Sequence, residues 1–378
     1  MPRRTALLAL ALGTAAGLTA CAEEPGSGAD AAADAGGPVA VTATDDSCEL
    51  SRTALTAGRN VFTITNAGSR VTEVYVYEGD RVVTEKEDIG PGVEYELTTQ
   101  IPAGEYDVAC VPGMVGDGIR TPVTVTAAAG GEEVDPAQQQ AVDAYRAYVQ
   151  EQADALVPLV AEFAAAVKAG DVERAKALYA PSRVPWEAVE PVAESFGDLD
   201  PKVDLREADL EEGQDWTGWH RLEKALWVDG STAGLEGVAD QLVADVTDLQ
   251  GRVQNADLSA ASIGNGAKEL LDEVATGKVT GEEEAFSHTD LVDFDANLAG
   301  AEKAYEVLSP IVRAEDPALA TELEAQFAAV EAALVPYATG GGTYVSYDTV
   351  TEDQRRELAR VVDALGEPLS RLAAVAAS

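Results

Sequence analysis

His220 and Glu223 are the two residues whose types and spacing indicate chemistry most directly. Residues three apart on a helix lie on one face, so an imidazole and a carboxylate at these positions can reach the same ion. A neutral imidazole together with carboxylates suits Fe, Zn or Mn. A lone helical histidine is more often structural, but the chain has only 2 histidines, and Trp216, Trp219 and Trp227 surround this one in the sequence. The pair therefore predicts a transition-metal site on a helix.

The helical elements that must position this pair follow a linker at 128–134. Asp135 as N-cap and Pro136 in the first turn start a long helix, which Gly170 ends. Beyond it, apolar residues recur at helical spacing, and Gly and Pro separate the segments. Further helices are predicted at about 172–180, 185–196, 215–228, 232–249, 255–276, 288–313, 317–335 and 351–376. Residues 135–378 are therefore predicted to form an all-α helical bundle, whose facing helices can bring acids together around one ion.

The segment before the linker, 39–127, has a period of two instead. Turn sequences rich in Gly, Pro and Asn separate its alternating runs, which favours a β-sandwich. Strands are predicted at 39–44, 60–65, 72–77, 93–97, 105–109 and 122–126. The length of the segment and its late Cys110-x-x-x-Met114 pattern resemble a cupredoxin. The fold class is thus an all-β cupredoxin-like sandwich followed by an all-α domain.

Cys48 and Cys110 are the cysteines of this sandwich. A blue-copper centre needs two histidines besides its cysteine, and residues 39–127 contain none, which argues against electron transfer by such a centre. One hypothesis is a disulfide, worth a few kcal/mol. The other is a modified metal site made by Cys48, Cys110 and Glu73, with Met114 as an additional ligand. The sequence leaves both open.

The first 21 residues have the parts of an export signal. Arg3 and Arg4 precede an apolar run at 6–18, which is too short to span a membrane. The run ends in Leu-Thr-Ala-Cys21, which resembles the bacterial lipobox and implies lipid on the Cys21 sulfur, with cleavage just before it. Residues 1–21 are thus predicted to be a lipoprotein signal peptide and 22–38 a flexible tether. The expected location is extracytoplasmic, with the protein lipid-anchored to the cell membrane.

Acidic residues dominate the composition. The 67 Asp and Glu residues against 26 Lys and Arg give a formal net charge of -41. Such a surface repels nucleic acid and anionic lipid and attracts cations at long range. The alternative interpretation is that the acidity only keeps the protein soluble. Nucleic acid is therefore not an expected partner.

The stretch from Trp216 to Trp227 resembles the imelysin family, in its EfeO branch, whose signature is His-x-x-Glu. The sandwich in front of a helical domain is also the EfeO arrangement, and the similar region covers about 137–378. Other segments that carry the resemblance are 179–183, 186–194, 196–200, 203–207, 280–284 and 287–291.

The resemblance implies further acidic metal ligands around His220 and Glu223. Two of them, Glu187 and Glu190, repeat the three-residue spacing. The others are Asp204 and Glu283, which lies within the run 282–284. One His with several carboxylates favours Fe or Mn over a closed Zn site. The implied function is capture of iron and its delivery to a membrane permease, with that permease and a haem-dependent peroxidase of the same uptake system as partners. Copper or zinc is the alternative metal.

Two alternative functions remain. Peptidase activity has been attached to the imelysin family, but zinc peptidases usually show His-Glu-x-x-His, which neither His220 nor His288 matches. His288 follows Ser287, a predicted N-cap with Asp290 three residues on, and is therefore read as structural. The chain is accordingly predicted not to be an enzyme. The second alternative is copper binding through the sandwich.

Overall fold

The computed structural model describes residues 37–79, 81–128, 135–196, 199–210 and 213–378. The predicted signal peptide, Cys21, most of the tether and most of the linker at 128–134 lie outside these residues. Among the described helices, none combines the length and the apolar composition that crossing a membrane requires.

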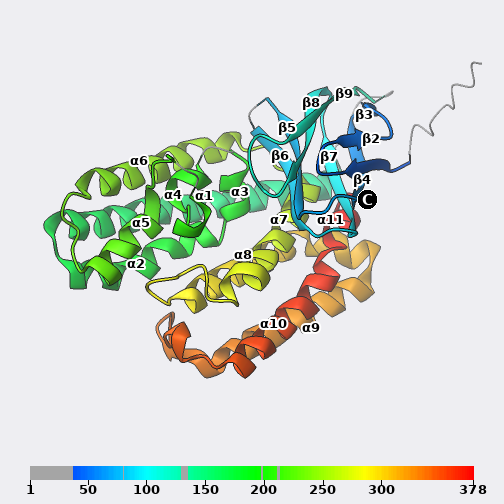
Figure 1. Cartoon of the computed structure of the whole chain (residues 1–378). Coiled ribbons are helices and arrows are strands. Elements are labelled where there is room, and N and C mark those ends of the chain that lie inside the picture. Colours follow the sequence, from blue (N-terminus) through cyan, green and yellow to red (C-terminus); the bar gives the residue numbers. More distant parts are fainter. Residues whose placement is uncertain (1–36, 80, 129–134, 197–198, 211–212) are drawn as a thin grey trace, which may run out of the picture. The chain divides into compact units, whose positions relative to one another are not determined.

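The N-terminal part is a sandwich of two sheets (Figure 1). One sheet has the order β2-β1-β4-β7 and the other β3-β9-β8-β5-β6. The strands are β1 Val39–Ala43, β2 Cys48–Leu50, β3 Ala54–Thr56, β4 Gly58–Asn66, β5 Thr72–Glu78, β6 Arg81–Ile89, β7 Glu94–Ile101, β8 Gly104–Pro112 and β9 Ile119–Thr126. All six predicted strands are present, and β2, β3 and β6 were not predicted. The cupredoxin-like β fold is confirmed.

Alternating side chains of the two sheets form the core of the sandwich. In β1, for example, Val39, Val41 and Ala43 are buried while the residues between them are exposed. Cys48 of β2 and Cys110 of β8 belong to this core and are joined by a disulfide. The bridge connects one sheet to the other across a sequence separation of 62 residues.

The rest of the chain is helical, as predicted. Its helices are α1 Pro136–Ala169, α2 Val172–Glu187, α3 Glu190–Glu194, α4 Asp200–Val203, α5 Gly218–Lys224, α6 Glu236–Arg252, α7 Ala260–Glu273, α8 Asp290–Glu315, α9 Pro317–Leu334, α10 Glu352–Leu369 and α11 Leu372–Ala376. Two π-helical segments, Ala225–Asp229 and Val274–Lys278, continue α5 and α7 directly. A short unpredicted hairpin joins β10 Ala338–Gly340 to β11 Thr343–Tyr344.

The ends of α1 are those predicted. The Asp135 side chain accepts hydrogen bonds from the backbone N–H groups of Ala137 and Gln138, and Gly170 ends the helix in a left-handed conformation. Helix α1 packs against α2 and α6, and α8 packs against α7 and α9 (Figure 1). A single apolar core runs through these helices. The start of α8 differs from the prediction, because Thr289 precedes it and the Ser287 hydroxyl donates to Glu284 instead of capping the helix.

Helix α7 contacts the sandwich at β6 and β7, and α11 contacts it at β7. Asn265 donates hydrogen bonds to Thr84 Oγ1 and to the carbonyl of Thr98. Lys86 Nζ lies 2.8 Å from an Asp272 carboxylate oxygen. These polar contacts fix α7 against the sandwich while its opposite face belongs to the helical core.

Candidate metal centre

Two hydrogen bonds and a close backbone contact to residues 202–205 bring His220 and Asp204 together. Trp216 Nε1 donates to the carbonyl of Leu205, and Thr217 Oγ1 donates to the carbonyl of Lys202, both at 2.7 Å. Gly218 has φ +78°, and a Cβ there would lie 2.2 Å from the carbonyl oxygen of Val203. Only glycine allows this approach. As a result, α5 begins directly beside the turn that carries Asp204.

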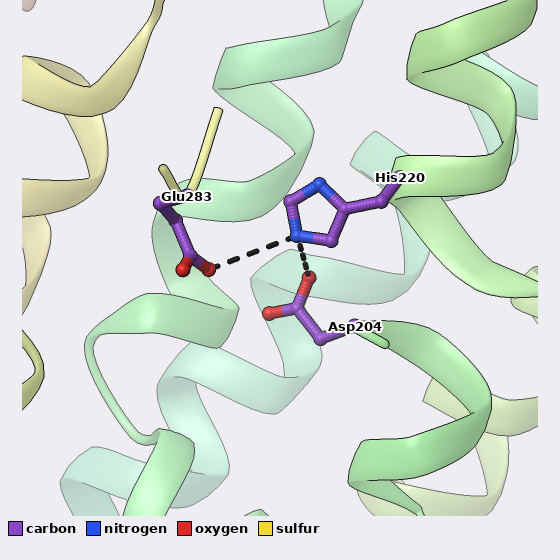
Figure 2. A group of neighbouring side chains, drawn as sticks. All are labelled: Asp204, His220 and Glu283. Carbon is purple, nitrogen blue, oxygen red and sulfur yellow. Dashed lines mark ion pairs between the residues drawn. The ribbon is translucent and has the colours of Figure 1, made fainter. Parts of the chain in front are cut away.

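His220 Nε2 faces two carboxylates (Figure 2). It lies 3.3 Å from Asp204 Oδ1 and 3.7 Å from Glu283 Oε1. The histidine is buried, and within the described residues Nε2 has no hydrogen-bond partner. Two ligand atoms bound to one first-row metal at about 2.1 Å, and separated by 90–120°, stand about 3.0–3.6 Å apart. The 3.3 Å distance falls within this range and the 3.7 Å distance lies just outside it, so a small inward shift of Glu283 would give the three groups the spacing of ligands of a single ion.

Glu223 contacts the other imidazole nitrogen. Its Oε2 lies 3.1 Å from Nδ1, and its Oε1 accepts the backbone N–H groups of Phe286 and Ser287. An ionised carboxylate only accepts hydrogen bonds, so Nδ1 carries the proton and the Nε2 lone pair is available when the ring is neutral. This is the usual relation between a metal-binding histidine and the carboxylate that orients it. In this arrangement Glu223 orients the ring, while His220, Glu223 and Glu284 also offer ligand atoms within 4.8 Å of one another, so direct binding of one ion by both His220 and Glu223 stays a prediction.

Arg183 of α2 is a positively charged side chain buried in the centre. Its guanidinium pairs with Asp204 and Glu187 and lies 2.9 Å from Glu284 Oε1. Trp186 Nε1 donates to the second oxygen of Asp204 at 2.7 Å. Arg183, Trp186 and Glu187 share one helix, so a single turn of α2 holds Asp204 toward His220.

Glu187 and Glu190 lie in the same polar interior but do not converge on the imidazole. Glu187 pairs with Arg183, and its other oxygen is 3.1 Å from Lys278 Nζ. Glu190 is 3.7 Å from the same ammonium and forms a group with Asp200 and Asp204. Of the six ligands predicted for the bundle, the structure brings Asp204, His220 and Glu283 to one point, with Glu223 behind the imidazole.

Carboxyls outnumber basic groups in this interior. The acids that the described residues bring into contact with Arg183, His220 or Lys278 are Glu187, Glu190, Asp204, Glu223, Glu273, Glu283, Glu284 and Asp293. Buried carboxylates that lack a partner must bind either a proton or a cation. Because acids are in excess, this interior favours the binding of additional protons or cations.

The pKa values show where protons supply that charge. Burial opposes ionisation of His220, but the three carboxylates around the ring outweigh it and raise the pKa of the imidazole well above its usual value. Burial also opposes ionisation of Glu283, yet Lys278 and His220 lower its pKa to about 2. In contrast, burial and the neighbouring Glu223 raise the pKa of Glu284 to about 8. A metal that takes Nε2 and the two carboxylates must displace the imidazole proton.

A surface pocket leads to this centre. Arg206, Glu283 and Phe286 line it together with His220 and Glu223. Arg206 Nη1 lies 3.3 Å from Glu283 Oε2, so an arginine stands beside the carboxylate that faces the imidazole. The pocket therefore lies on the side of the centre where Glu283 keeps 11% of its side chain exposed.

The sandwich hypothesis of a cysteine metal site does not match the structure. Disulfide sulfurs are not thiolate ligands. Glu73 also lies on the wrong face, because its neighbour Val74 pairs with Cys110 and successive side chains of a strand point to opposite faces. The Tyr75 hydroxyl donates to Glu73 and Glu87 instead, and Met114 is half-exposed.

Several residues of the centre were not predicted. They are Arg183, Asp200, Lys278, Glu284 and Asp293. The four-residue spacing of Arg183 and Glu187 was a usable signal, since it places an ion pair on one helix face. Among 67 acids, nothing local to Asp200 or Asp293 distinguishes them. His288 lies outside the groups around His220, and its carbonyl accepts the backbone N–H of Tyr347.

Two family models match the chain. The model described as Imelysin matches residues 141–372, and the model described as Cupredoxin-like domain matches residues 8–125. Proteins named "Iron uptake system component EfeO" from Escherichia coli strain K12, Escherichia coli O157:H7 and Shigella flexneri are each 39% identical over 347 residues. The match covers 89% of this chain and 91% of each relative.

Proposed function

Since the chain belongs to the imelysin family, in its EfeO branch with an N-terminal cupredoxin-like domain, we propose that it is an extracytoplasmic iron-binding protein of an iron-uptake system. Iron is its cargo, and the centre around His220 is where the ion binds. The relatives carry iron uptake in their names, and the helical domain that the imelysin model matches contains the whole centre.

The observation that supports this proposal best is the buried Nε2 of His220. It has no hydrogen-bond partner within the described residues, and it faces Asp204 and Glu283 at 3.3 and 3.7 Å. One nitrogen with two carboxylates is a donor set that iron and manganese accept, whereas closed structural zinc sites use more Cys and His. Glu223 fixes the tautomer that such binding requires.

The charge of the protein suits capture of a cation. A net charge of -41 attracts cations over distances longer than any single contact. The pocket then presents Glu283 and His220 to them. Release needs only that protons return to the imidazole and the acids, since each proton restores the charge that the metal supplied.

The proposal extends to the membrane. Cys21 at the end of a lipobox-like sequence would carry a lipid that holds the protein at the cell membrane, and residues 22–38 would tether the folded part to it. A permease of the uptake system would take the iron, with a haem-dependent peroxidase as the other component. These partners follow from the family resemblance.

Anaerobic calorimetric titration with Fe²⁺ tests the binding site. We expect His220→Asn and Asp204→Asn each to lower the affinity at least about 100-fold, equivalent to about 2.7 kcal/mol. His288→Asn is the matched control, because it removes the other histidine at a position with φ +57°, which asparagine tolerates. Equal affinities for wild type and His220→Asn would reject the site.

Cell fractionation tests the anchor. The wild-type protein should sediment with membranes and partition into detergent, and Cys21→Ala should move it to the soluble fraction. Mass spectrometry of the mature wild-type protein should find the lipid on an N-terminal Cys21. A soluble wild-type protein that retains residues 1–20 would contradict the proposal.

A further inference from the structure

Three carboxylates meet beside the iron site proposed above. Glu190, Asp200 and Asp204 each offer an oxygen, and these oxygens lie within 4.8 Å of one another. Asp204 is at the same time a member of the group with His220 and Glu283. We propose that Glu190, Asp200 and Asp204 form a second cation site, so that two cations share the Asp204 carboxylate.

Local helical structure produces this arrangement. Asp200 begins α4 and Asp204 follows its last residue, so the two are four apart, and the Asp204 N–H donates to the Asp200 carbonyl at 2.9 Å. That spacing stacks both carboxylates on one face of the turn. Glu190 begins α3, which contacts α4. The backbone therefore sets the three acids together before any ion binds.

An independent observation on Glu190 indicates a missing ligand. The side chain is buried, with 6% of its surface exposed, and its Oε2 has no hydrogen-bond partner among the described residues. Lys278 Nζ is 3.7 Å away, outside hydrogen-bond range, and lies closer to Glu273 at 2.9 Å. A buried carboxylate oxygen without a hydrogen bond is costly, and a bound cation would satisfy it.

The basic groups nearby pair mainly with acids other than Glu190 and Asp200, while Asp204 pairs with Arg183. The described ion pairs of Arg183 involve Glu187, Asp204, Glu283, Glu284 and Asp293. Those of Lys278 involve Glu273 at 2.9 Å, Glu187 at 3.1 Å and, more distantly, Glu190 at 3.7 Å. Asp204 alone connects Arg183 and His220 to the new group, so a cation there would share only this ligand with the first site.

The chemistry of the second site differs from that of the first. Its three ligands are carboxylate oxygens without nitrogen, which favours a hard cation such as Mn²⁺ or Fe³⁺. The first site adds an imidazole. Two cations that share a carboxylate stand about 3.5–4 Å apart in protein sites of this kind. The inference builds on the proposed iron-binding function but assigns the protein a capacity of two ions.

Manganese provides the test, because two Mn²⁺ ions at this distance give a spin-coupled paramagnetic resonance spectrum. We expect full-length wild type to bind two equivalents and to show coupling. Asp200→Asn and Glu190→Gln should each weaken one equivalent at least tenfold and leave an uncoupled one-ion spectrum. The control Asp215→Asn, at an exposed position, should retain both ions and the coupling.

The outcomes separate the two proposals. A wild type that binds a single Mn²⁺, or an Asp200→Asn variant that keeps a coupled pair, overturns the second site. Loss of coupling in Asp200→Asn together with unchanged Fe²⁺ affinity in His220→Asn would instead reject the first. Melting curves establish that each variant is folded, and if Asp200→Asn is not, the wild-type spectrum and Glu190→Gln decide.

Discussion

The sandwich and the bundle treat their reactive side chains in opposite ways. In the sandwich, Cys48 and Cys110 bond to each other, and Glu73 is hydrogen-bonded to Tyr75 on the other face of the sheet. In the bundle, His220, Asp204 and Glu283 face one another. The acids around them outnumber the basic groups that could neutralise them. The reactive groups of the sandwich are thus paired, whereas the bundle buries more acids than basic groups.

This difference shows that a reactive residue type does not by itself make a site. Both regions hold groups that bind metals in other proteins. What separates them is whether each group already has a partner. Four changes test this comparison, two in each region.

The largest effect should come from the disulfide. For a separation of 62 residues, the loop-entropy model gives the Cys48–Cys110 bridge about 4 kcal/mol of stability. Replacing both cysteines by serine should lower the melting temperature sharply while the Fe²⁺ affinity of the folded protein stays unchanged. A large loss of affinity in this variant would mean that the sandwich contributes to the metal site.

Gly218→Ala should have the second-largest effect. The new Cβ would press on the Val203 carbonyl, in a left-handed conformation that alanine disfavours, and we expect a loss of about 3 kcal/mol. Because Asp204 would move, Fe²⁺ affinity should fall as well. Gly234→Ala is the control, since Gly234 has φ +83° and open space around it, and should cost only about 1 kcal/mol without loss of affinity.

Glu73 should make the stability depend on pH. Burial, aided by Glu87, raises its pKa to about 7 from an ordinary value of 4.5. The folded state therefore holds a proton that the unfolded state releases, so stability falls as pH rises from about 4.5 through 7. Glu73→Gln should remove about 2 kcal/mol of that loss. Urea unfolding at pH 5 and pH 8 measures it, and identical pH dependence in both proteins would contradict the assignment.

Glu223→Gln should have the smallest effect. Glutamine keeps an oxygen for the backbone N–H groups of Phe286 and Ser287 but places an amide against Nδ1–H. Misorienting the imidazole should weaken Fe²⁺ binding about tenfold. Titration of Glu236→Gln, an exposed glutamate that does not line the pocket, provides the control. A loss as large as that of His220→Asn would instead make Glu223 a direct ligand.

The order of the two domains and most helices could be predicted from periodicity. Strand β6 was missed because its Arg81, Glu85, Lys86, Glu87 and Asp88 obscure the alternation of apolar residues. Strands β2 and β3 have three residues each, too few to establish a period. The β10–β11 hairpin escaped for the same reason, since β11 has two residues.

The centre itself was only partly predictable. Spacing on one helix identified His220 and Glu223, and the family resemblance added Asp204 and Glu283. Spacing could not show that Glu223 would contact the other nitrogen of the ring, because this depends on the loop at Phe286 and Ser287. Nor could it show that Lys278, from a distant part of the chain, would reach Glu187.

The π-helical segment Val274–Lys278 has a consequence for how this domain tolerates change in length. A π turn contains one residue more than an α turn, so each side chain beyond it is rotated relative to a regular helix. Deleting one residue there would turn Lys278 by about 100° around the axis. The ammonium would leave Glu187 and Glu273, although no residue of the centre had been altered. The rotational position of Lys278 around the helix axis therefore matters to the centre as much as the identity of its acids does.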